Sequence, residues 1–185
     1  ISETTPERPQ TYYGSSKLKA DKELVAMNDR EFKAAIIRPP MAYGGGMAPG
    51  NMLRLIRLVN KHIPLPFGSA RNSRDFINVK NLVEFIHLAV EKEVEGVFYP
   101  TDKVPYSTRN VVEEISRQLG VHTINLPSPS IFLKLIEKVR PDLYQKLWGD
   151  VVIDRQLALS AIGYEPRYTL EDGIREMVES FKRQK

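Results

Sequence analysis

Tyr13 and Lys17 are the two residues of this sequence whose types and spacing are best suited to catalysis. They are four residues apart, and on a helix this spacing brings two side chains to the same face. A phenol with its ordinary pKa of about 10 is a poor base at neutral pH, but a neighbouring ammonium group favours the phenolate and lowers that pKa. A tyrosine held beside a lysine can therefore pass a proton to or from a substrate hydroxyl or carbonyl group.

The spacing alone is weak evidence, because the sequence contains it twice. Tyr99 and Lys103 are also four residues apart, but Pro100 directly follows that tyrosine. A proline after an apolar run is typical of a strand that ends in a loop, so this second pair is not expected to share a helix face. Tyr13, by contrast, opens a strongly helical run over residues 17–27. The context therefore favours the first pair.

Two further groups have the chemistry of anion binding. Arg71 and Arg74 are three residues apart, and guanidinium groups bind phosphate oxygens through paired hydrogen bonds; the two arginines could equally be surface residues that confer solubility. Residues 43–50 are rich in glycine and follow a predicted strand, where ligands of parallel α/β folds bind, although a mobile turn explains such a run as well. The sequence contains no G-x-G-x-x-G or Walker motif.

Metal and thiol chemistry are not expected. The sequence has no cysteine, which excludes disulfides and a catalytic thiolate. Its three histidines, His62, His87 and His122, are isolated from one another and have no second ligand at helical spacing. We therefore predict no metal site.

Length and composition indicate an ordinary globular protein. The 185 residues suffice for one domain, with or without a small additional lobe, and 42% are hydrophobic and 27% charged. No apolar run approaches the roughly 20 residues of a membrane span and no signal-peptide pattern is present, so we expect a cytoplasmic protein without a membrane partner. A net charge of +4 suits a small anionic ligand and does not indicate nucleic acid. Because the chain starts with Ile1, we expect a fragment of a longer protein.

Helices and strands alternate along the sequence, which predicts an α/β fold with parallel strands. The predicted strands are 32–38, 75–79 (alternating), 97–99, 123–126 and 151–153. The predicted helices are 17–27, 52–61 with Asn51 as its cap, 81–90 with Leu82, Phe85, Ile86 and Ala89 facing inward, 107–119 with Gly120 as its C-cap, 131–139, 141–148, 154–162 and 171–182. Helix 131–139 is apolar enough for a membrane surface, but Lys134, Glu137 and Lys138 predict an ordinary solvated side.

Five motifs occur in an order typical of one enzyme family. They are Tyr13-Gly14-Ser15-Ser16-Lys17 preceded by Glu3, Pro6 and Pro9; Ile37-Arg38-Pro39-Pro40-Met41-Ala42-Tyr43-Gly44; Pro64-Leu65-Pro66-Phe67-Gly68; Arg74-Asp75-Phe76-Ile77-Asn78-Val79; and Ile162-Gly163-Tyr164-Glu165-Pro166 followed by Leu170-Glu171-Asp172-Gly173-Ile174. Together they resemble the extended short-chain dehydrogenase/reductases, the NAD-dependent epimerase/dehydratase family. The nearest likeness is to nucleotide-sugar 4-epimerases and 4-ketoreductases of bacterial surface-polysaccharide biosynthesis.

The resemblance implies the remainder of a Rossmann-like parallel sheet plus a small mixed α/β substrate-binding lobe. Residues 1–50 would be the end of the nucleotide-binding domain. Residues 51–185 would mainly form the substrate lobe, with 76–100 returning to the parallel sheet. The glycine-rich dinucleotide turn of the family precedes the position of Tyr13 and is absent here, so the chain alone is expected to be inactive.

The resemblance also implies roles for particular residues. Tyr13 would be the acid/base at the sugar C4 oxygen, and Lys17 would bind the nicotinamide ribose of NAD or NADP. The remaining implied positions are Pro39 and Pro40 at the nicotinamide, Asn51 and Arg74 at the substrate diphosphate, and Leu65 and Phe67 at its uracil. The substrate would be a UDP-hexose or UDP-N-acetylhexosamine, and a homodimer could form through the helix of Tyr13 and Lys17.

The sequence departs from the family pattern at two positions of the matching motifs. Met41 replaces a common asparagine, and Lys80 replaces an acidic residue. The sequence does not decide among epimerase, dehydratase and ketoreductase. Two alternatives also stay open: an NADP-dependent ketone reductase of another substrate class, such as flavonoids or steroids, and a non-catalytic module that binds nucleotide sugars.

Overall fold

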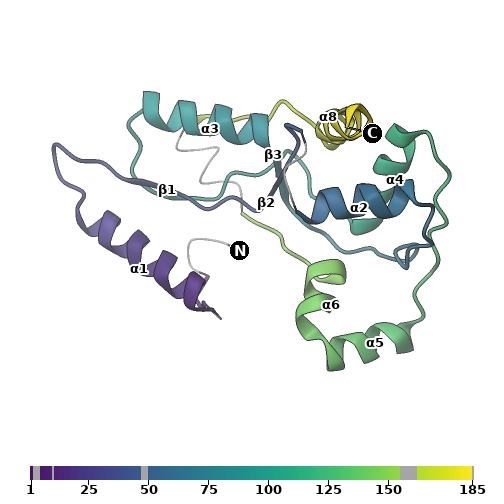
Figure 1. Ribbon diagram of the computed structural model, residues 1–185. Coiled ribbons are helices and arrows are strands. Elements are labelled where there is room, and N and C mark those ends of the chain that lie inside the picture. Colours follow the sequence, from purple (N-terminus) through teal and green to yellow (C-terminus); the bar gives the residue numbers. More distant parts are fainter. Residues whose placement is uncertain (2–4, 10, 47–49, 155–161, 185) are drawn as a thin grey trace.

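The computed structural model describes the chain except for residues 2–4, 10, 47–49, 155–161 and 185. Figure 1 shows its helices and strands. The helices are α1 (Tyr12–Ala26), α2 (Asn51–Asn60), α3 (Val79–Glu91), α4 (Thr108–Leu119), α5 (Ser130–Val139), α6 (Pro141–Trp148) and α8 (Leu170–Arg183). The strands are β1 (Ala35–Ile37), β2 (Met41–Tyr43), β3 (Phe76–Asn78) and β4 (Gly96–Phe98).

The described strands form two parallel pairs. β1 pairs with β4, with Ala35 opposite Gly96, and β2 pairs with β3, with Met41 opposite Phe76. Helix α3 follows β3 and leads to β4, which belongs to the other pair. The predicted α/β class with parallel strands is therefore confirmed.

Two hydrophobic clusters support these pairs. The larger lies among α2, α4 and α8, where Ile56, Ile115 and Ile174 are fully buried. These helices lie together on the right of Figure 1, beside β2 and β3. The smaller cluster joins α3 to β4 and to the segment after residue 161; in it the ring of Phe85 meets that of Tyr164 edge to face at 5.2 Å. Each strand pair is thus held by its own core.

The starts of α4 and α8 confirm the predicted helix signals. Ser107 and Asn110 exchange hydrogen bonds between side chain and backbone at the start of α4, and Thr169 and Asp172 do the same for α8. Gly120 ends α4 in the left-handed conformation, with φ of 72°, which glycine adopts without strain. These ends depend on contacts within a few residues, which is why sequence reasoning located them.

The predicted strand 32–38 is too long, because a turn occupies its first part. The carboxylate of Asp29 accepts hydrogen bonds from the backbone N–H groups of Glu31 and Phe32, and the Asp29 N–H donates to the Phe32 carbonyl. β1 therefore starts only at Ala35. The chain needs to leave α1 and reverse before it enters the sheet, and the side chain of Asp29 makes this reversal possible.

Strand β2 was not predicted. Pro39 and Pro40 directly follow the predicted strand 32–38, a position typical of the end of a strand. In the structure they lie between two strands of different pairs, β1 and β2. Proline lacks a backbone donor but permits an extended chain, so two prolines can separate strands without adding a loop.

Other expectations need correction or lie outside the described residues. The three residues of β3 are all buried rather than alternating, because packed elements cover both sides. Asn51 is the first residue of α2 and not its N-cap; the N-cap is Gly50, which makes no side-chain hydrogen bond. At the start of α3, the side chain of Asn78 caps the helix. Ile86 is exposed, and the predicted strands 123–126 and 151–153 form only isolated bridges. Residues 155–161 of the predicted helix 154–162, and Glu3, lie outside the described residues.

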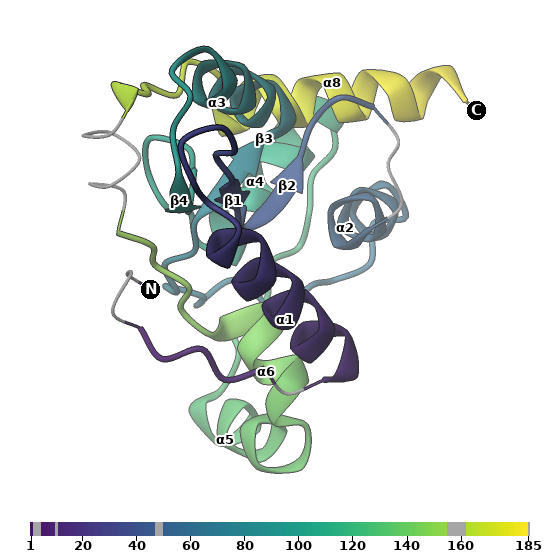
Figure 2. The ribbon, with the colours of Figure 1, turned by 90° about the vertical axis from the view of Figure 1, so that its left-hand side faces the viewer.

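Helix α6 starts and ends as predicted and α5 starts one residue earlier, at Ser130, but the packing of both helices differs from the expectation. The two helices pack against each other, and neither has a buried side chain. Figure 2 places α5 at the lower end of the molecule, beyond α6. None of the described helices is long and apolar enough to cross a membrane. The described residues also include no cluster of three acidic or histidine side chains able to hold a metal ion.

Candidate active site

Helix α1 presents Tyr13 and Lys17 on one side, as their spacing predicts. Thr11 caps the helix through a 3.0 Å hydrogen bond from the Gly14 N–H to its side-chain oxygen. The Nζ atom of Lys17 lies 5.7 Å from the centre of the Tyr13 ring, over its face. The Tyr13 side chain is 73% exposed. The phenol and the ammonium group are therefore close together and accessible to a ligand.

A cavity of about 640 Å³ lies beside this pair. Its wall is formed by α1, by the extended segment 5–9, by residues 36–38 of β1 and its end, and by Tyr99. Tyr13, Lys17 and Asp21 lie one helical turn apart along α1 and all line it. The cavity lies at the end of the β1–β4 pair, where parallel α/β sheets bind ligands.

Arg38 fixes α1 against the sheet. Its Nε donates to the Asp21 carboxylate at 2.8 Å, its Nη1 lies 2.6 Å from the Glu7 carboxylate, and the same nitrogen donates to the Tyr99 hydroxyl at 3.0 Å. Burial opposes its charge, but these three partners outweigh burial and raise the pKa of the guanidinium group. Because α1 has no buried side chain, this cluster is its main described attachment near the cavity.

The other predicted cofactor residues, Pro39 and Pro40, follow in the sequence a residue that lines the cavity. Pro39 is exposed and Pro40 half-buried, and both directly follow Arg38 at the end of β1. Neither is among the residues that line the cavity. The structure thus places them beyond the cavity wall and does not bring them against Tyr13.

The predicted substrate residues lie around the β2–β3 pair. Asn51 is exposed at the start of α2. Leu65 and Phe67 are 4% and 5% exposed in the larger core, and the Phe67 ring packs 5.3 Å from that of Trp148. A ligand at this segment would therefore meet its main chain and not these two side chains.

Arg74 is half-buried and turned toward the end of α6. Its Nη1 donates to the carbonyl oxygens of Gln145 and Gly149, at 2.7 Å each. Burial lowers the pKa of this guanidinium group, and Asp150 opposes the effect. A guanidinium group has five N–H donors, so the two carbonyl contacts leave the Nε and Nη2 donors for a further anionic partner.

Sequence reasoning missed a buried polar cluster around Asp102. Its carboxylate accepts hydrogen bonds from the Tyr43 hydroxyl at 2.6 Å, from the Asn78 N–H at 2.9 Å and from the Asn81 side-chain amide at 2.6 Å. Burial raises the pKa of Asp102 above its usual range, and these three donors oppose that effect. The Asn81 oxygen also accepts from the backbone N–H of Tyr168. The cluster therefore joins β2, α3 and the segments that precede α4 and α8.

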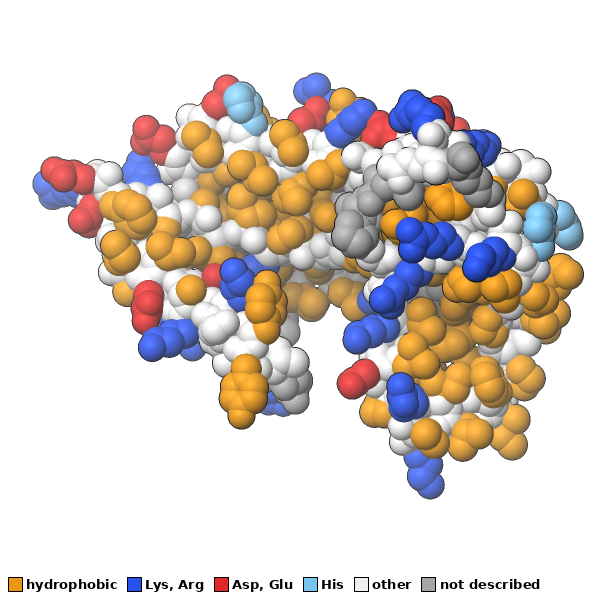
Figure 3. Space-filling model, in the orientation of Figure 1, with side chains coloured by type: hydrophobic (Ala, Val, Ile, Leu, Met, Phe, Trp, Pro, Cys, Tyr) orange, Lys and Arg blue, Asp and Glu red, His pale blue; other side chains and the backbone are white. Residues whose placement is uncertain are grey.

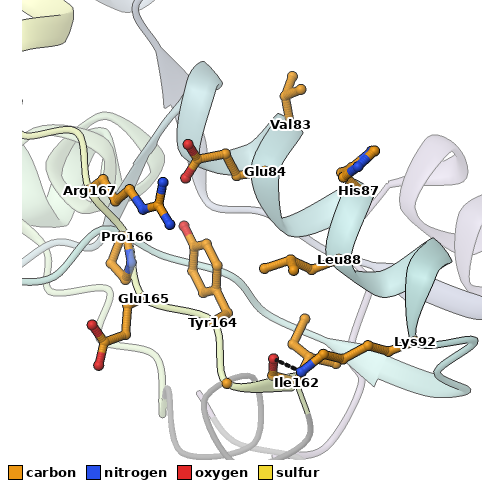
Figure 4. Close-up of a pocket in the computed structure, with 11 residues that line it drawn as sticks. Val83, Glu84, His87, Leu88, Lys92, Ile162, Tyr164, Glu165, Pro166 and Arg167 are labelled. Carbon is orange, nitrogen blue, oxygen red and sulfur yellow. Dashed lines mark hydrogen bonds between the residues drawn. The ribbon is translucent and has the colours of Figure 1, made fainter.

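A second cavity, of about 580 Å³, lies between α3 and the segment 162–167 (Figure 4). Tyr164 packs beneath it, and its hydroxyl has no hydrogen-bond partner among the described residues. The wall carries acidic Glu84 and Glu165 together with basic Lys92 and Arg167, and Lys92 donates to the Ile162 carbonyl. This mixture of charges favours no single class of ligand, so the candidate active site is the cavity at Tyr13 and Lys17.

Comparisons with known proteins identify the family and the fold. Residues 1–99 match the model of the "NAD dependent epimerase/dehydratase family". A UDP-glucose 4-epimerase of Vibrio cholerae is 35% identical over 179 residues, which cover 94% of this chain and 54% of that protein. The chain thus spans about half the length of this curated relative.

Solved structures share the fold. The UDP-glucuronic acid 4-epimerase of Bacillus cereus, solved in complex with NAD, matches 99% of this chain and 56% of its own with a TM-score of 0.75 and 20% identity. The dTDP-glucose 4,6-dehydratase of Bacillus anthracis, also solved with NAD, matches 100% of this chain and 56% of its own with a TM-score of 0.74 and 20% identity. The family match over more than half of the sequence confirms the resemblance that the motifs indicated, and the chain belongs to the NAD dependent epimerase/dehydratase family.

Proposed function

We propose that this chain is the carboxyl-terminal part of an NAD-dependent enzyme that acts at C4 of a UDP-hexose or UDP-N-acetylhexosamine, as a 4-epimerase or 4-ketoreductase. The observation that carries the proposal is the pair of Tyr13 and Lys17 on one side of α1 beside a cavity. The family and the 35% identical UDP-glucose 4-epimerase support the class of substrate.

The residues at the cavity fit the nicotinamide end of NAD. The ammonium group of Lys17 lies over the Tyr13 ring and beside the cavity, where its three N–H donors can reach ribose hydroxyls. Tyr13 is accessible from the same side, whereas Pro39 and Pro40 do not line this cavity, so their role at the nicotinamide rests on the resemblance to the family. When bound, NAD would take up or return a hydride at the sugar carbon. The glycine-rich turn for its diphosphate is not in this sequence, so the chain alone would be inactive.

Other steps, proton transfer and substrate binding, are assigned to residues of this chain. Tyr13 passes a proton to or from the C4 oxygen of the sugar, and Lys17 stabilises the phenolate while that proton is away. Arg74, with Nε and Nη2 donors left over, binds the substrate diphosphate together with Asn51. The main chain of residues 65–67 lies against the uracil. A second copy would pair through α1, which has no buried side chain.

The test is Tyr13→Phe in the full-length enzyme, with Tyr12→Phe as the matched control. Tyr12 is the neighbouring tyrosine on the same helix and is 98% exposed. Removal of the hydroxyl from Tyr13 should lower turnover of the UDP-sugar by about 10²–10⁴-fold, the usual contribution of a general acid or base. Tyr12→Phe should retain full turnover, and both variants should still bind UDP and NAD in calorimetry.

Near-normal turnover of Tyr13→Phe would contradict the assignment of the acid/base. UDP should compete with the substrate in the normal enzyme. If UDP does not compete and the enzyme reduces a flavonoid or steroid ketone with NADPH, the proposed substrate class is wrong. The proposed role of Tyr13 would not be affected by that result.

A further inference from the structure

Helix α5 carries apolar side chains that the described part of the chain does not cover. Ile131, Leu135 and Val139 are four residues apart, which places them along one side of the helix, and they are 78%, 59% and 64% exposed. Phe132 is also exposed. A surface helix ordinarily turns such a stripe toward the core. Here the stripe faces outward.

Neighbouring loops enlarge this surface. The Leu65 N–H donates to the Ile124 carbonyl at 3.0 Å, and the Leu126 N–H donates to the Leu65 carbonyl at 2.8 Å, so the two loops lie side by side. Leu65 points inward, whereas Ile124, Leu126 and Ile63 are exposed. We define the α5 patch as the following exposed apolar residues: Ile63, Ile124, Leu126, Ile131, Phe132, Leu135 and Val139. Figure 3 shows hydrophobic side chains gathered over this end of the molecule. Exposed apolar side chains gathered at one end of a molecule mark an interaction site.

The charges around the α5 patch are mainly positive. Residues 130–148, which form α5 and α6, contain four exposed basic residues against two acidic ones: Lys134, Lys138, Arg140 and Lys146 against Glu137 and Asp142. Helix α2, which leads to Ile63, adds Arg54 and Arg57 and contains no acidic residue. Figure 3 shows basic side chains along the margin of the hydrophobic surface. The patch therefore complements an apolar partner with negative charge around it.

The shape of this region favours a lipid surface over a protein groove. In Figures 1 and 2 α5 lies at the far end of the molecule, so the patch is a projection and not a hollow. Ten residues of helix measure about 15 Å, too short to cross a bilayer but sufficient to lie in its headgroup region. Apolar side chains would then enter the acyl boundary while lysines and arginines meet lipid phosphates.

We propose that the α5 patch docks the enzyme on the surface of a bilayer that contains anionic lipid. The sequence had led us to expect an ordinary solvated helix and no membrane partner. The new observation is that the apolar side of α5, and not only its charged side, is exposed. The inference requires neither NAD nor a sugar nucleotide, so it stands apart from the proposed activity.

Flotation with lipid vesicles tests the inference. The full-length enzyme should float with vesicles of equal parts phosphatidylcholine and phosphatidylglycerol, and not with phosphatidylcholine alone. Raised salt should weaken the association, because it screens the contribution of the lysines and arginines. Ile131→Asp with Leu135→Asp should lower vesicle binding by about tenfold or more, since charges replace the side chains that enter the acyl boundary.

The matched control is Ile86→Asp with Val90→Asp, two exposed apolar residues at the same spacing on α3. This variant should bind vesicles as the normal enzyme does. The proposal fails if the normal enzyme does not float with anionic vesicles, or if the Ile131 and Leu135 variant floats equally well. Sedimentation tests the rival occupant, a second copy of the chain. A second copy would cover the patch if the normal enzyme is a dimer that binds no vesicles and the Ile131 and Leu135 variant is a monomer.

Discussion

Asp102 is the buried carboxyl group on which several segments of this molecule depend. Its partners Tyr43, Asn78 and Asn81 come from β2, β3 and α3. The sequence did not indicate the hydrogen bond from Tyr43 to Asp102, because the two residues are 59 positions apart. Tyr13 and Lys17 were found because their relation is local, whereas the relation of Tyr43 to Asp102 exists only after folding. Local spacing predicted the candidate catalytic pair, and no local signal predicted the cluster behind it.

The titration of Asp102 predicts a specific dependence of stability on pH. Burial raises its pKa in the folded protein, so the folded state favours the protonated form. Its contribution to stability is then complete below its unfolded-state pKa and is lost as pH rises through the folded value. Asp102→Asn keeps a polar group but cannot titrate. The unfolding free energy of the normal protein should fall relative to Asp102→Asn as pH rises, by at most about 1.4 kcal/mol per pH unit.

Urea denaturation at a series of pH values measures this difference. The comparison between the two proteins is needed because Asp29 and Asp172 have lowered pKa values, owing mainly to backbone hydrogen bonds, and their contributions grow as pH rises. Parallel curves for the normal protein and Asp102→Asn would contradict the raised pKa.

Helix α1 is the element whose position matters most for the proposed chemistry, and polar contacts determine that position. It has no buried side chain, while α8 buries six residues along one side. Sequence patterns predicted where α1 lies in the sequence, because helix signals are local. They did not predict the Arg38 cluster, because its partners Glu7, Asp21 and Tyr99 are distant in sequence. Strand β2 was missed for a related reason: three residues form a strand only because β3 lies beside them.

We predict that Arg38 positions Tyr13 through α1. In the full-length enzyme Arg38→Met should lower kcat by up to about 10²-fold, since a displacement of about 1 Å at a reacting group has effects of this size. The KM for the UDP-sugar should change little, because Arg38 is placed at the cavity of Tyr13 and not at the predicted substrate residues. Steady-state kinetics of the purified variant provide both values.

Glu23→Gln is the control for this variant. It removes an exposed ion pair with Lys19 on the same helix, at 3.8 Å, which should contribute at most about 1 kcal/mol to stability and nothing to turnover. If Arg38→Met and Glu23→Gln have the same kcat, Arg38 has no positioning role.

The whole molecule combines two strand pairs that differ in how well they are covered. The β2–β3 pair lies against the large core of α2, α4 and α8, and the β1–β4 pair against the smaller cluster around Phe85. Alternating elements predicted the parallel α/β class correctly, since this class follows from their order. The division into two short pairs was not predictable, because it depends on which strands meet in space.

This difference predicts uneven protection from hydrogen exchange. In the 185-residue chain alone, backbone amides of α1 should exchange faster than those of α4 and α8 by several orders of magnitude, because α1 lacks buried side chains. In the full-length enzyme, the proposed pairing of two copies through α1 predicts slower exchange of these amides. Mass spectrometry of exchanged peptides measures both. Equal protection of α1 and α8 in the isolated chain would contradict the account of α1.

Only Arg38, Pro39 and Pro40 separate β1 from β2. Two consecutive prolines restrict backbone rotation, so this connection is torsionally stiff. A rotation of the β2–β3 pair would therefore be transmitted to the end of β1, and through Arg38 to helix α1, which carries Tyr13. The β2–β3 pair and the phenol of Tyr13 would then move together and not independently.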